Sequence, residues 1–290
     1  MKRGKLLVLL TALPMVFGGC DALDIFKADS LEAPHVKLTG RVMFNGQPVP
    51  VRIPDDSQLR LWHTSWEAGD SLRQPTSMGV HLDMDGTYSA LIYDGTYEIQ
   101  LIDGQGPWAS DTTRIPIVVS GDSMAVDVPV QPYHTIQGEP TIAFTPPAAG
   151  DTTGGRITAT FNVGQHVASP AIDLVGLYIS TTRFVDRENR ETSLQGSWTY
   201  PEITPGVDNP TPAGQSERDP HERERAQVQA ELDANSPITI TLILPSTVRT
   251  SLNNDGPVPR THLYARVGVK AENWNELAYS NVVPVDISLP

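Results

Sequence analysis

The sequence predicts an all-β protein made of two β-sandwich domains in tandem. Short apolar runs with period-two alternation recur along the chain, and turn dipeptides such as Asn45-Gly46 and Asp94-Gly95 separate them. A helical period is confined to one short, highly charged segment at 223–232. The chain has 290 residues, a length that suits about two domains after an N-terminal leader.

The leader is predicted to be a lipoprotein signal peptide over residues 1–19. A basic start and an apolar run over 6–17 precede Gly18-Gly19-Cys20. The run is too short to span a bilayer and has the length of a signal-peptide core. Small residues before a cysteine resemble a lipobox, in which the cysteine sulfur receives a lipid. Cys20 is therefore the predicted lipidation site, through which the mature chain would be anchored to a membrane.

The alternative is an ordinary secretory signal that is cleaved nearby. Cys20 is the only cysteine of the chain, and a lone cysteine is unusual in an exported protein. Lipidation accounts for it. Residues 20–35, which mix charged residues with Ala and Pro, are expected to be a lipidated tether.

Composition limits the partners. Removal of the leader leaves 18 basic against 34 acidic residues, a formal charge of −16. Such a balance opposes binding to nucleic acid, which requires a basic patch. With 25 Pro, 23 Gly and 39% hydrophobic residues, the chain is rich in loops but not disordered in composition.

The first sandwich is predicted over 36–131. Strands are expected at 38–44, 59–66, 80–82, 88–93, 97–102, 115–119 and 124–130, separated by turn signals. The strands at 88–93 and 97–102 each place alternate apolar residues on one face. The Asp94-Gly95 turn between them predicts a hairpin.

Three short motifs carry a family resemblance. Thr39-Gly-Arg-Val-Met-Phe-Asn-Gly-Gln-Pro-Val-Pro50, followed by Asp85-Gly-Thr-Tyr88 and Gly95-Thr-Tyr97, resembles the carboxypeptidase-regulatory-type, transthyretin-like sandwich. In that family a strand runs into a Gly-x-Pro turn and a later hairpin ends in Gly-x-Tyr. The resemblance implies a fold that accompanies many functions and identifies none of them.

The second sandwich is predicted over 132–290, with strands at 142–144, 156–163, 172–180, 238–244, 263–270 and 282–287. The segments 263–271 and 278–281, with an alternating final strand, resemble the end of a fibronectin type III domain, an immunoglobulin-like sandwich. Alternation predicts a core of Leu263, Ala265, Val267 and Val269. The strand pattern stops over 200–235, which is predicted to be an insertion. Pro220 suits the first position of a helix, and residues 223–232 are predicted to form its charged body.

The sequence lacks the common catalytic and cofactor motifs. It contains no nucleophile elbow, zinc-binding His-Glu-x-x-His, phosphate loop or dinucleotide fingerprint. His63 with His81 would be a weak metal pair, and Asp83-Met-Asp85-Gly86 is better explained as a turn than as a calcium loop. Glu67 with Asp70, or Asp83 with Asp85, are generic carboxylate pairs for glycoside hydrolysis. We expect a chain without enzymatic activity, cofactor or metal.

Tryptophan residues are the candidate ligand contacts. Trp62 and Trp66 are four residues apart in one predicted strand, so they face the same side, and Trp108 lies in a Gly-rich loop that could reach them. Exposed indoles stack on sugar rings. The alternative is that Trp62 and Trp66 belong to the core or to a domain interface. Trp108, in a polar loop, is expected to be the most exposed of the three.

The order of leader, tether and two sandwiches is similar to a family of two-domain surface lipoproteins of unknown function from Bacteroidota-type bacteria. This resemblance implies an outer-membrane or cell-surface accessory protein beside SusC/SusD-type glycan uptake proteins. It supplies no catalytic residue. We therefore expect a membrane-anchored carbohydrate-binding or accessory module. The alternative is a structural adaptor that docks a protein partner through the 200–235 insertion.

Overall fold

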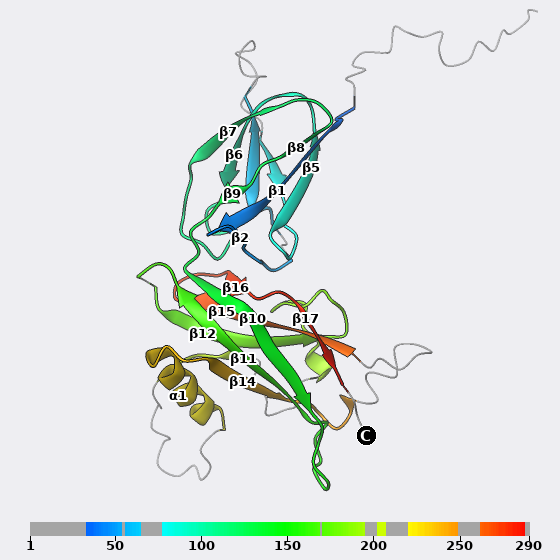
Figure 1. Ribbon diagram of the computed structural model, residues 1–290, viewed down its shortest axis with the longest axis vertical. Coiled ribbons are helices and arrows are strands. Elements are labelled where there is room, and N and C mark those ends of the chain that lie inside the picture. Colours follow the sequence, from blue (N-terminus) through cyan, green and yellow to red (C-terminus); the bar gives the residue numbers. More distant parts are fainter. Residues whose placement is uncertain are drawn as a thin grey trace, which may run out of the picture. The chain divides into compact units, whose positions relative to one another are not determined.

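The computed structural model describes residues 33–53, 56–64, 77–168, 170–194, 202–206, 220–248 and 262–287. Residues His35–Pro290 form one compact unit. Its described part consists of two β-sandwiches, shown in Figure 1, which confirms the predicted all-β fold class. Within these ranges no helix is long and apolar enough to cross a bilayer.

Two sheets form the first sandwich. In one, β1 (Val36–Phe44) pairs antiparallel with β2 (Gln47–Pro48) and β5 (Thr87–Ile92), and parallel with β8 (Ser123–Ala125) and β9 (Val128–Pro129). The other has the order β4-β3-β6-β7, from β4 (Ser77–Val80), β3 (Leu59–His63), β6 (Gly95–Leu101) and β7 (Arg114–Val119). The predicted Asn45-Gly46 turn joins β1 to β2, and both of its residues have positive φ, 48° and 77°.

The predicted hairpin between 88–93 and 97–102 is wrong. β5 pairs with β1, whereas β6 pairs with β3 and β7 in the opposite sheet. The Asp94-Gly95 turn therefore carries the chain from one sheet to the other. A tight turn reverses the chain in either arrangement, so the dipeptide does not determine which strands share hydrogen bonds.

The core of the first sandwich lies between the two sheets and is filled by alternate residues of their strands. Leu38, Tyr88 and Ile92 come from one sheet, and Leu61 and Ile99 from the other; all are at most 5% exposed. Gly40 leaves the space that the Tyr88 ring occupies, since a Cβ at Gly40 would lie 2.7 Å from that ring. The Tyr88 hydroxyl donates to the carbonyl oxygen of Val126 at 2.6 Å.

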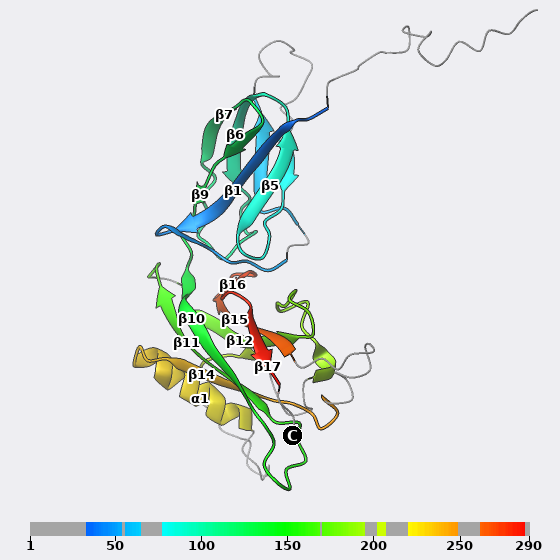
Figure 2. The same cartoon turned by 45° about the vertical axis from the view of Figure 1, so that its right-hand side comes forward.

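The second sandwich also has two sheets, seen from another side in Figure 2. One has the order β10-β11-β14, from β10 (His134–Thr145), β11 (Arg156–Gln165) and β14 (Ile238–Ile243). The other has the order β13-β12-β15-β16, from β13 (Glu202–Ile203), β12 (Ile172–Ser180), β15 (His262–Ala271) and β16 (Leu277–Tyr279), and β17 (Val283–Asp286) also pairs with β15. The predicted core set of Leu263, Ala265, Val267 and Val269 is confirmed, because each is at most 1% exposed.

A helix and a short turn complete the second sandwich. The helix α1 (Pro220–Asp233) begins at the predicted proline, and Figure 2 shows it beside β14. Val228 of α1 is fully buried in the core of this sandwich, and Leu232 packs against that core. The 3-10 turn η3 (Thr192–Leu194) adds the buried Leu194. The described part of the 200–235 insertion is thus a packed element of its own domain.

Polar groups of the second sandwich bind the backbone of the first. Arg266 of β15 is only 1% exposed, and its guanidinium donates to the carbonyl oxygens of Val51 at 2.8 Å and Met84 at 2.9 Å. The carboxylate of Asp186, which is fully buried, accepts from the backbone N–H of Ile53 at 3.0 Å. Buried charges require such partners. These bonds join the two sandwiches.

Candidate functional site

The outer face of the β4-β3-β6-β7 sheet carries an indole among charged and amide side chains. In the strand register Trp62 lies opposite Glu98, and Arg60 opposite Gln100, which in turn lies opposite Arg114. Residues directly opposite each other share one face of a sheet. The inward-facing neighbours Leu61 and Ile99 are buried in the core, so these five side chains point outward. We call Arg60, Trp62, Glu98, Gln100 and Arg114 the Trp62 face.

The side chains of the Trp62 face hold one another in place. The Trp62 indole Nε1 donates to Gln100 Oε1 at 2.9 Å, and Gln100 Nε2 donates to the carbonyl oxygen of Thr112 at 3.0 Å. The guanidinium carbon of Arg114 lies over the Trp62 ring, 4.1 Å from its centroid, and Arg114 Nη1 donates to Glu98 Oε2 at 3.1 Å. The guanidinium carbon of Arg60 lies 5.6 Å from the same centroid. Cations at these distances are attracted to the indole.

Trp108 does not belong to this face, and the expectation that it is exposed is wrong. Its ring is 2% exposed and belongs to the core of the first sandwich. The loop folds back on the following segment, where Trp108 bridges to Pro132 and the Ala109 N–H donates to the Gln131 carbonyl oxygen at 2.8 Å. Gly106 makes room for the ring, because a Cβ there would lie 2.1 Å from it. The prediction that Trp108 stacks on a ligand loses its basis.

Several predicted site residues lie outside the described residues: Trp66, which follows β3 by three positions, Cys20 at the start of the predicted tether, and the candidate carboxylate pair Glu67 and Asp70. Of the three predicted tryptophan contacts, the structure therefore places Trp62 on an outward face and Trp108 in the core. The ligand role of Trp66 and the lipidation of Cys20 remain predictions.

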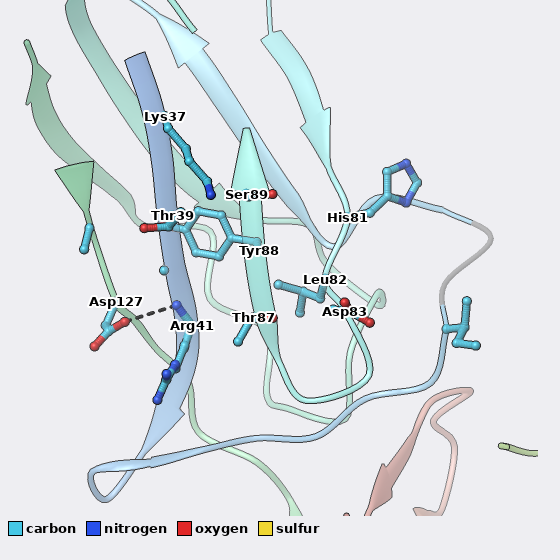
Figure 3. A pocket seen from close by; sticks show the side chains of 13 residues that line it. Lys37, Thr39, Arg41, His81, Leu82, Asp83, Thr87, Tyr88, Ser89 and Asp127 are labelled. Carbon is cyan, nitrogen blue, oxygen red and sulfur yellow. Dashed lines mark hydrogen bonds between the residues drawn. The ribbon is translucent and has the colours of Figure 1, made fainter. Parts of the chain in front are cut away.

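A concave surface of about 800 Å³ lies on the sheet built around β1 and β5 (Figure 3). Its lining mixes cations, carboxylates and hydroxyls: Lys37, Thr39 and Arg41 come from β1, Thr87 and Ser89 from β5, and Asp83 and Asp127 from neighbouring segments. Asp127 accepts a hydrogen bond from the Arg41 backbone N–H at 3.1 Å. Tyr88 is its sole aromatic phenol, and that side chain is 5% exposed. The hollow is also lined by the exposed imidazole of His81, but it has no open phenol or indole ring.

The Asp83–Asp85 segment forms the predicted turn. The Gly86 N–H donates to the Asp83 carbonyl oxygen at 2.9 Å, and Gly86 has a φ of 77°. Burial raises the pKa of the Asp85 carboxyl, but hydrogen bonds from the Thr87 hydroxyl and N–H outweigh it and lower the pKa below its ordinary value. A carboxyl held ionised in this way does not serve as a general acid at neutral pH.

The predicted histidine pair is not brought together as a metal site. His63 is 6% exposed and packs edge-on against Tyr97, with ring centroids 4.4 Å apart. His81 is exposed, and its Nε2 lies 3.3 Å from the Ser57 hydroxyl. In the part of the chain that the structure describes, no group of three or more His, Cys, Asp or Glu side chains could hold a metal ion.

Sequence reasoning missed the arginines of the Trp62 face. Arg60 could have been found, since it is two residues from Trp62 in a predicted strand and therefore shares its face. Arg114 could not, because its position over Trp62 depends on the register of β6 with both β3 and β7. Trp274 also lies outside this face: it is half-buried and donates from Nε1 to the Gly106 carbonyl oxygen at 2.6 Å.

The described chain consists of two β-sandwiches, and the family comparisons agree with this two-part layout. Residues 36–131 match the N-terminal domain of a protein family of unknown function, DUF3823, and residues 148–284 match its C-terminal domain, also of unknown function. This chain belongs to the DUF3823 family. None of the curated proteins compared with it matches.

Solved structures of the same family resemble this one. A DUF3823 protein from Parabacteroides merdae is 25% identical, with a TM-score of 0.60, and one from Bacteroides ovatus is 24% identical, with a TM-score of 0.57. A protein from Bacteroides uniformis, described as a "putative carbohydrate binding protein", is 15% identical, with a TM-score of 0.57. Each alignment covers 88% of this chain and 100% of the other. At these identities the structures show mainly the shared fold.

Proposed function

We propose that this protein is a non-catalytic, membrane-anchored carbohydrate-binding protein that contacts sugar through the Trp62 face. The observation that carries the proposal is the Trp62 indole on the outer face of a paired sheet, beside Gln100, Glu98 and two arginines. Sugar rings present C–H groups to an aromatic surface and hydroxyls to polar side chains at its edge. Both kinds of group are present here within one patch.

The rigidity of the patch supports this function. Trp62 is central in the strand register, with β4 paired on one side of β3 and β6 on the other. Its indole N–H and the Gln100 amide are already hydrogen-bonded to the protein. Side chains that are ordered before a ligand arrives lose little conformational entropy on binding.

The polar hollow over β1 and β5 fits a sugar less well. It has hydroxyls and charges, but Tyr88 donates its hydroxyl to Val126 and is almost fully buried, so its ring faces the core. Without an open phenol or indole ring, a sugar in this hollow would rely mainly on hydrogen bonds that compete with water, each of which contributes about 0.5–1.5 kcal/mol. The Trp62 face is therefore the stronger candidate.

The adaptor function through the 200–235 insertion gains no specific support. Val228 of α1 is buried in its own sandwich, and residues 224–233 expose Ala and polar or charged side chains. In the described part of the insertion we find no exposed large apolar side chain that a protein partner would cover.

Two further lines support the proposal. The related structure from Bacteroides uniformis is described as a "putative carbohydrate binding protein", and neither family description names a catalytic activity. The lone Cys20 after an apolar leader supports anchoring by lipid, which would place the protein at the outer membrane or cell surface, and an association with a SusC/SusD-type uptake complex would suit that location.

The experiment is a glycan-array screen of the full chain beside Trp62→Ala and the control Leu91→Ala. Leu91 is 59% exposed on β5, in the other sheet of the same sandwich. We expect the intact protein and the control to bind the same glycans, and Trp62→Ala to weaken binding by about tenfold or more, as for a central aromatic contact. A blank array with folded protein would refute the function, and binding that Trp62→Ala leaves unchanged would refute the site.

A further inference from the structure

We infer that the carbohydrate recognised by the Trp62 face is acidic, and that Arg60 and Arg114 bind its carboxylate or sulfate group. This inference rests on the proposed function and adds the chemical class of the ligand. It follows from three properties: the free hydrogen-bond donors of the two guanidinium groups, the fixed orientation of the Arg114 guanidinium, and the charge of both groups.

The first property is the number of free donors. A guanidinium has five N–H donors. Arg114 donates from Nη1 to Glu98, and its Nε and Nη2 have no acceptor among the described residues. The Arg60 guanidinium has no hydrogen-bonded or ion-paired partner in the described ranges, where its one side-chain interaction is with the Trp62 ring. The Nε and Nη2 edge of an arginine matches the two oxygens of a carboxylate or sulfate.

The second property is the orientation of Arg114. Its guanidinium is held from two sides, by the Trp62 ring at 4.1 Å and by the Glu98 carboxylate at 3.1 Å. Arg114 is otherwise accessible, with a side chain that is 43% exposed. A planar group that is stacked and hydrogen-bonded on one side presents its remaining donors in a fixed direction. Glu98 thus positions Arg114 without covering its free edge.

The third property is charge. The full chain has a formal net charge of −13, yet the Trp62 face holds two cations against the single carboxylate of Glu98. Two guanidinium groups near one ring repel each other, and one cation–π contact at an exposed site contributes only about 0.5–1 kcal/mol. If arginine stacked on Trp62 only to stabilise the sheet, one guanidinium would be enough. An anionic group of a ligand would relieve the repulsion of two.

The ligand is therefore expected to place a ring against the indole and an acidic group at the arginines. A uronic acid sugar and a sulfated sugar share this chemistry. A neutral sugar would leave the second cation without a function and would face a surface with excess positive charge. The difference in affinity between the acidic and the neutral form of one oligosaccharide therefore measures the contribution of the acidic group.

The test uses matched ligands. Calorimetry with the full chain compares a uronic acid oligosaccharide with the same oligosaccharide as its methyl ester, and a sulfated oligosaccharide with its desulfated form. We expect an acidic form to bind at least about tenfold more tightly than its neutral partner, with affinity falling as salt is raised. Whichever pair shows the difference identifies carboxylate or sulfate as the group that is bound.

Variants separate charge from stacking. Arg60→Gln and Arg114→Gln are each expected to reduce the preference for the acidic form by about tenfold, whereas Trp62→Ala weakens both forms. Lys37→Gln is the control, since Lys37 is exposed on β1 and its ammonium has no hydrogen-bonded or ion-paired partner among the described residues. If the preference for the acidic form came from the overall charge of the sandwich, Lys37→Gln would reduce it as well. An unchanged preference in Lys37→Gln therefore shows that the effect is local to the Trp62 face.

The outcomes distinguish this inference from the proposed function. Equal binding of acidic and neutral forms, lost in Trp62→Ala but not in Arg60→Gln, would overturn the acidic ligand and leave the carbohydrate function standing. No binding of any oligosaccharide by folded protein would overturn the function and the inference together. Loss of the preference for the acidic form in the Lys37→Gln control would show a general charge effect, and it would overturn the inference that Arg60 and Arg114 bind the acidic group.

Discussion

The guanidinium of Arg266 donates to the carbonyl oxygen of Val51 at 2.8 Å, across 215 residues of sequence. The same guanidinium reaches the carbonyl oxygens of Met84 and Ser280, and it lies 4.4 Å from the centroid of the Tyr279 ring. Burial lowers the pKa of Arg266 to about 10, which leaves it charged at neutral pH. One buried cation thereby completes the hydrogen bonding of backbone groups in both sandwiches.

Replacement of Arg266 by methionine should destabilise the protein by about 3 kcal/mol, because it removes three hydrogen bonds and leaves buried carbonyl groups short of partners. Urea unfolding monitored by tryptophan fluorescence gives the free energy of unfolding. Arg156→Met is the matched control, since Arg156 is exposed at the start of β11 and should change stability by less than about 0.5 kcal/mol. Similar losses in both variants would contradict a special role for Arg266.

Trp108→Ala should cost about 3–5 kcal/mol of unfolding free energy, because it empties a buried indole site in the first sandwich. Trp62→Ala should cost about 1–2 kcal/mol, since that side chain is half-buried and loses one hydrogen bond to Gln100. Thermal or urea unfolding of the two variants compares them directly. If the order of the two losses were reversed, the assignment of Trp108 to the core and Trp62 to the surface would be wrong.

Much of the second sandwich could be predicted because its long strands carry apolar residues that either alternate, as in β11, or run continuously, as in β12. β12 spans the predicted 172–180, and β11, β14 and β15 differ from prediction by two residues or fewer at each end. β10 runs over twelve residues, of which only 142–144 were predicted, because Gly138 and Pro140 interrupt its pattern and its register shifts between Gln137 and Thr141. The two- and three-residue strands β2, β13 and β16 carry too few side chains for a pattern.

The candidate site could be predicted only in part. Alternation within one strand placed Trp62 on a face, and that inference needs no other strand. Two further facts depend on pairing between strands that are far apart in sequence. One is that this face points outward, and the other is that Arg114 lies over the Trp62 ring. Trp108 misled the prediction because polar, Gly-rich neighbours suggest exposure, whereas Gly106 in fact provides the space that the buried ring fills.

His134 should make stability depend on pH. It is 2% exposed at the start of β10, and burial, together with the neighbouring His166, lowers its pKa from 6.5 to about 4. The unfolded chain therefore binds more protons between these values, so stability from this group is complete above pH 6.5 and is lost as pH falls toward 4. The loss should reach about 3 kcal/mol.

Urea unfolding at pH 7.5 and pH 4.5 checks this, with His134→Gln compared with the intact protein. Carboxyl groups titrate in both proteins, so the difference between them isolates His134. The intact protein should lose more stability on acidification than His134→Gln, and His81→Gln, which alters an exposed ring, should behave like the intact protein. An equal acid response of the intact protein and His134→Gln would contradict the buried neutral imidazole.

Cys20→Ala should release the protein from membranes if Cys20 carries the lipid. Each buried methylene of an acyl chain contributes about 0.8 kcal/mol, so loss of the lipid removes the proposed anchor. Fractionation of cells that express the intact chain or the variant measures the change, and unfolding of the released protein should match that of the intact chain. A variant that stays with the membrane fraction would refute anchoring through Cys20.

The pairing of β1 has a consequence for the order in which the chain can fold. β1 opens the first sandwich, yet its parallel partners β8 and β9 arrive last, and the Arg41 N–H bonds Asp127 across 86 residues. The entropy of closing this long loop is lost before its stabilising contacts form, and this cost slows folding. Until residue 129 is available, one edge of β1 remains open to pairing with other chains.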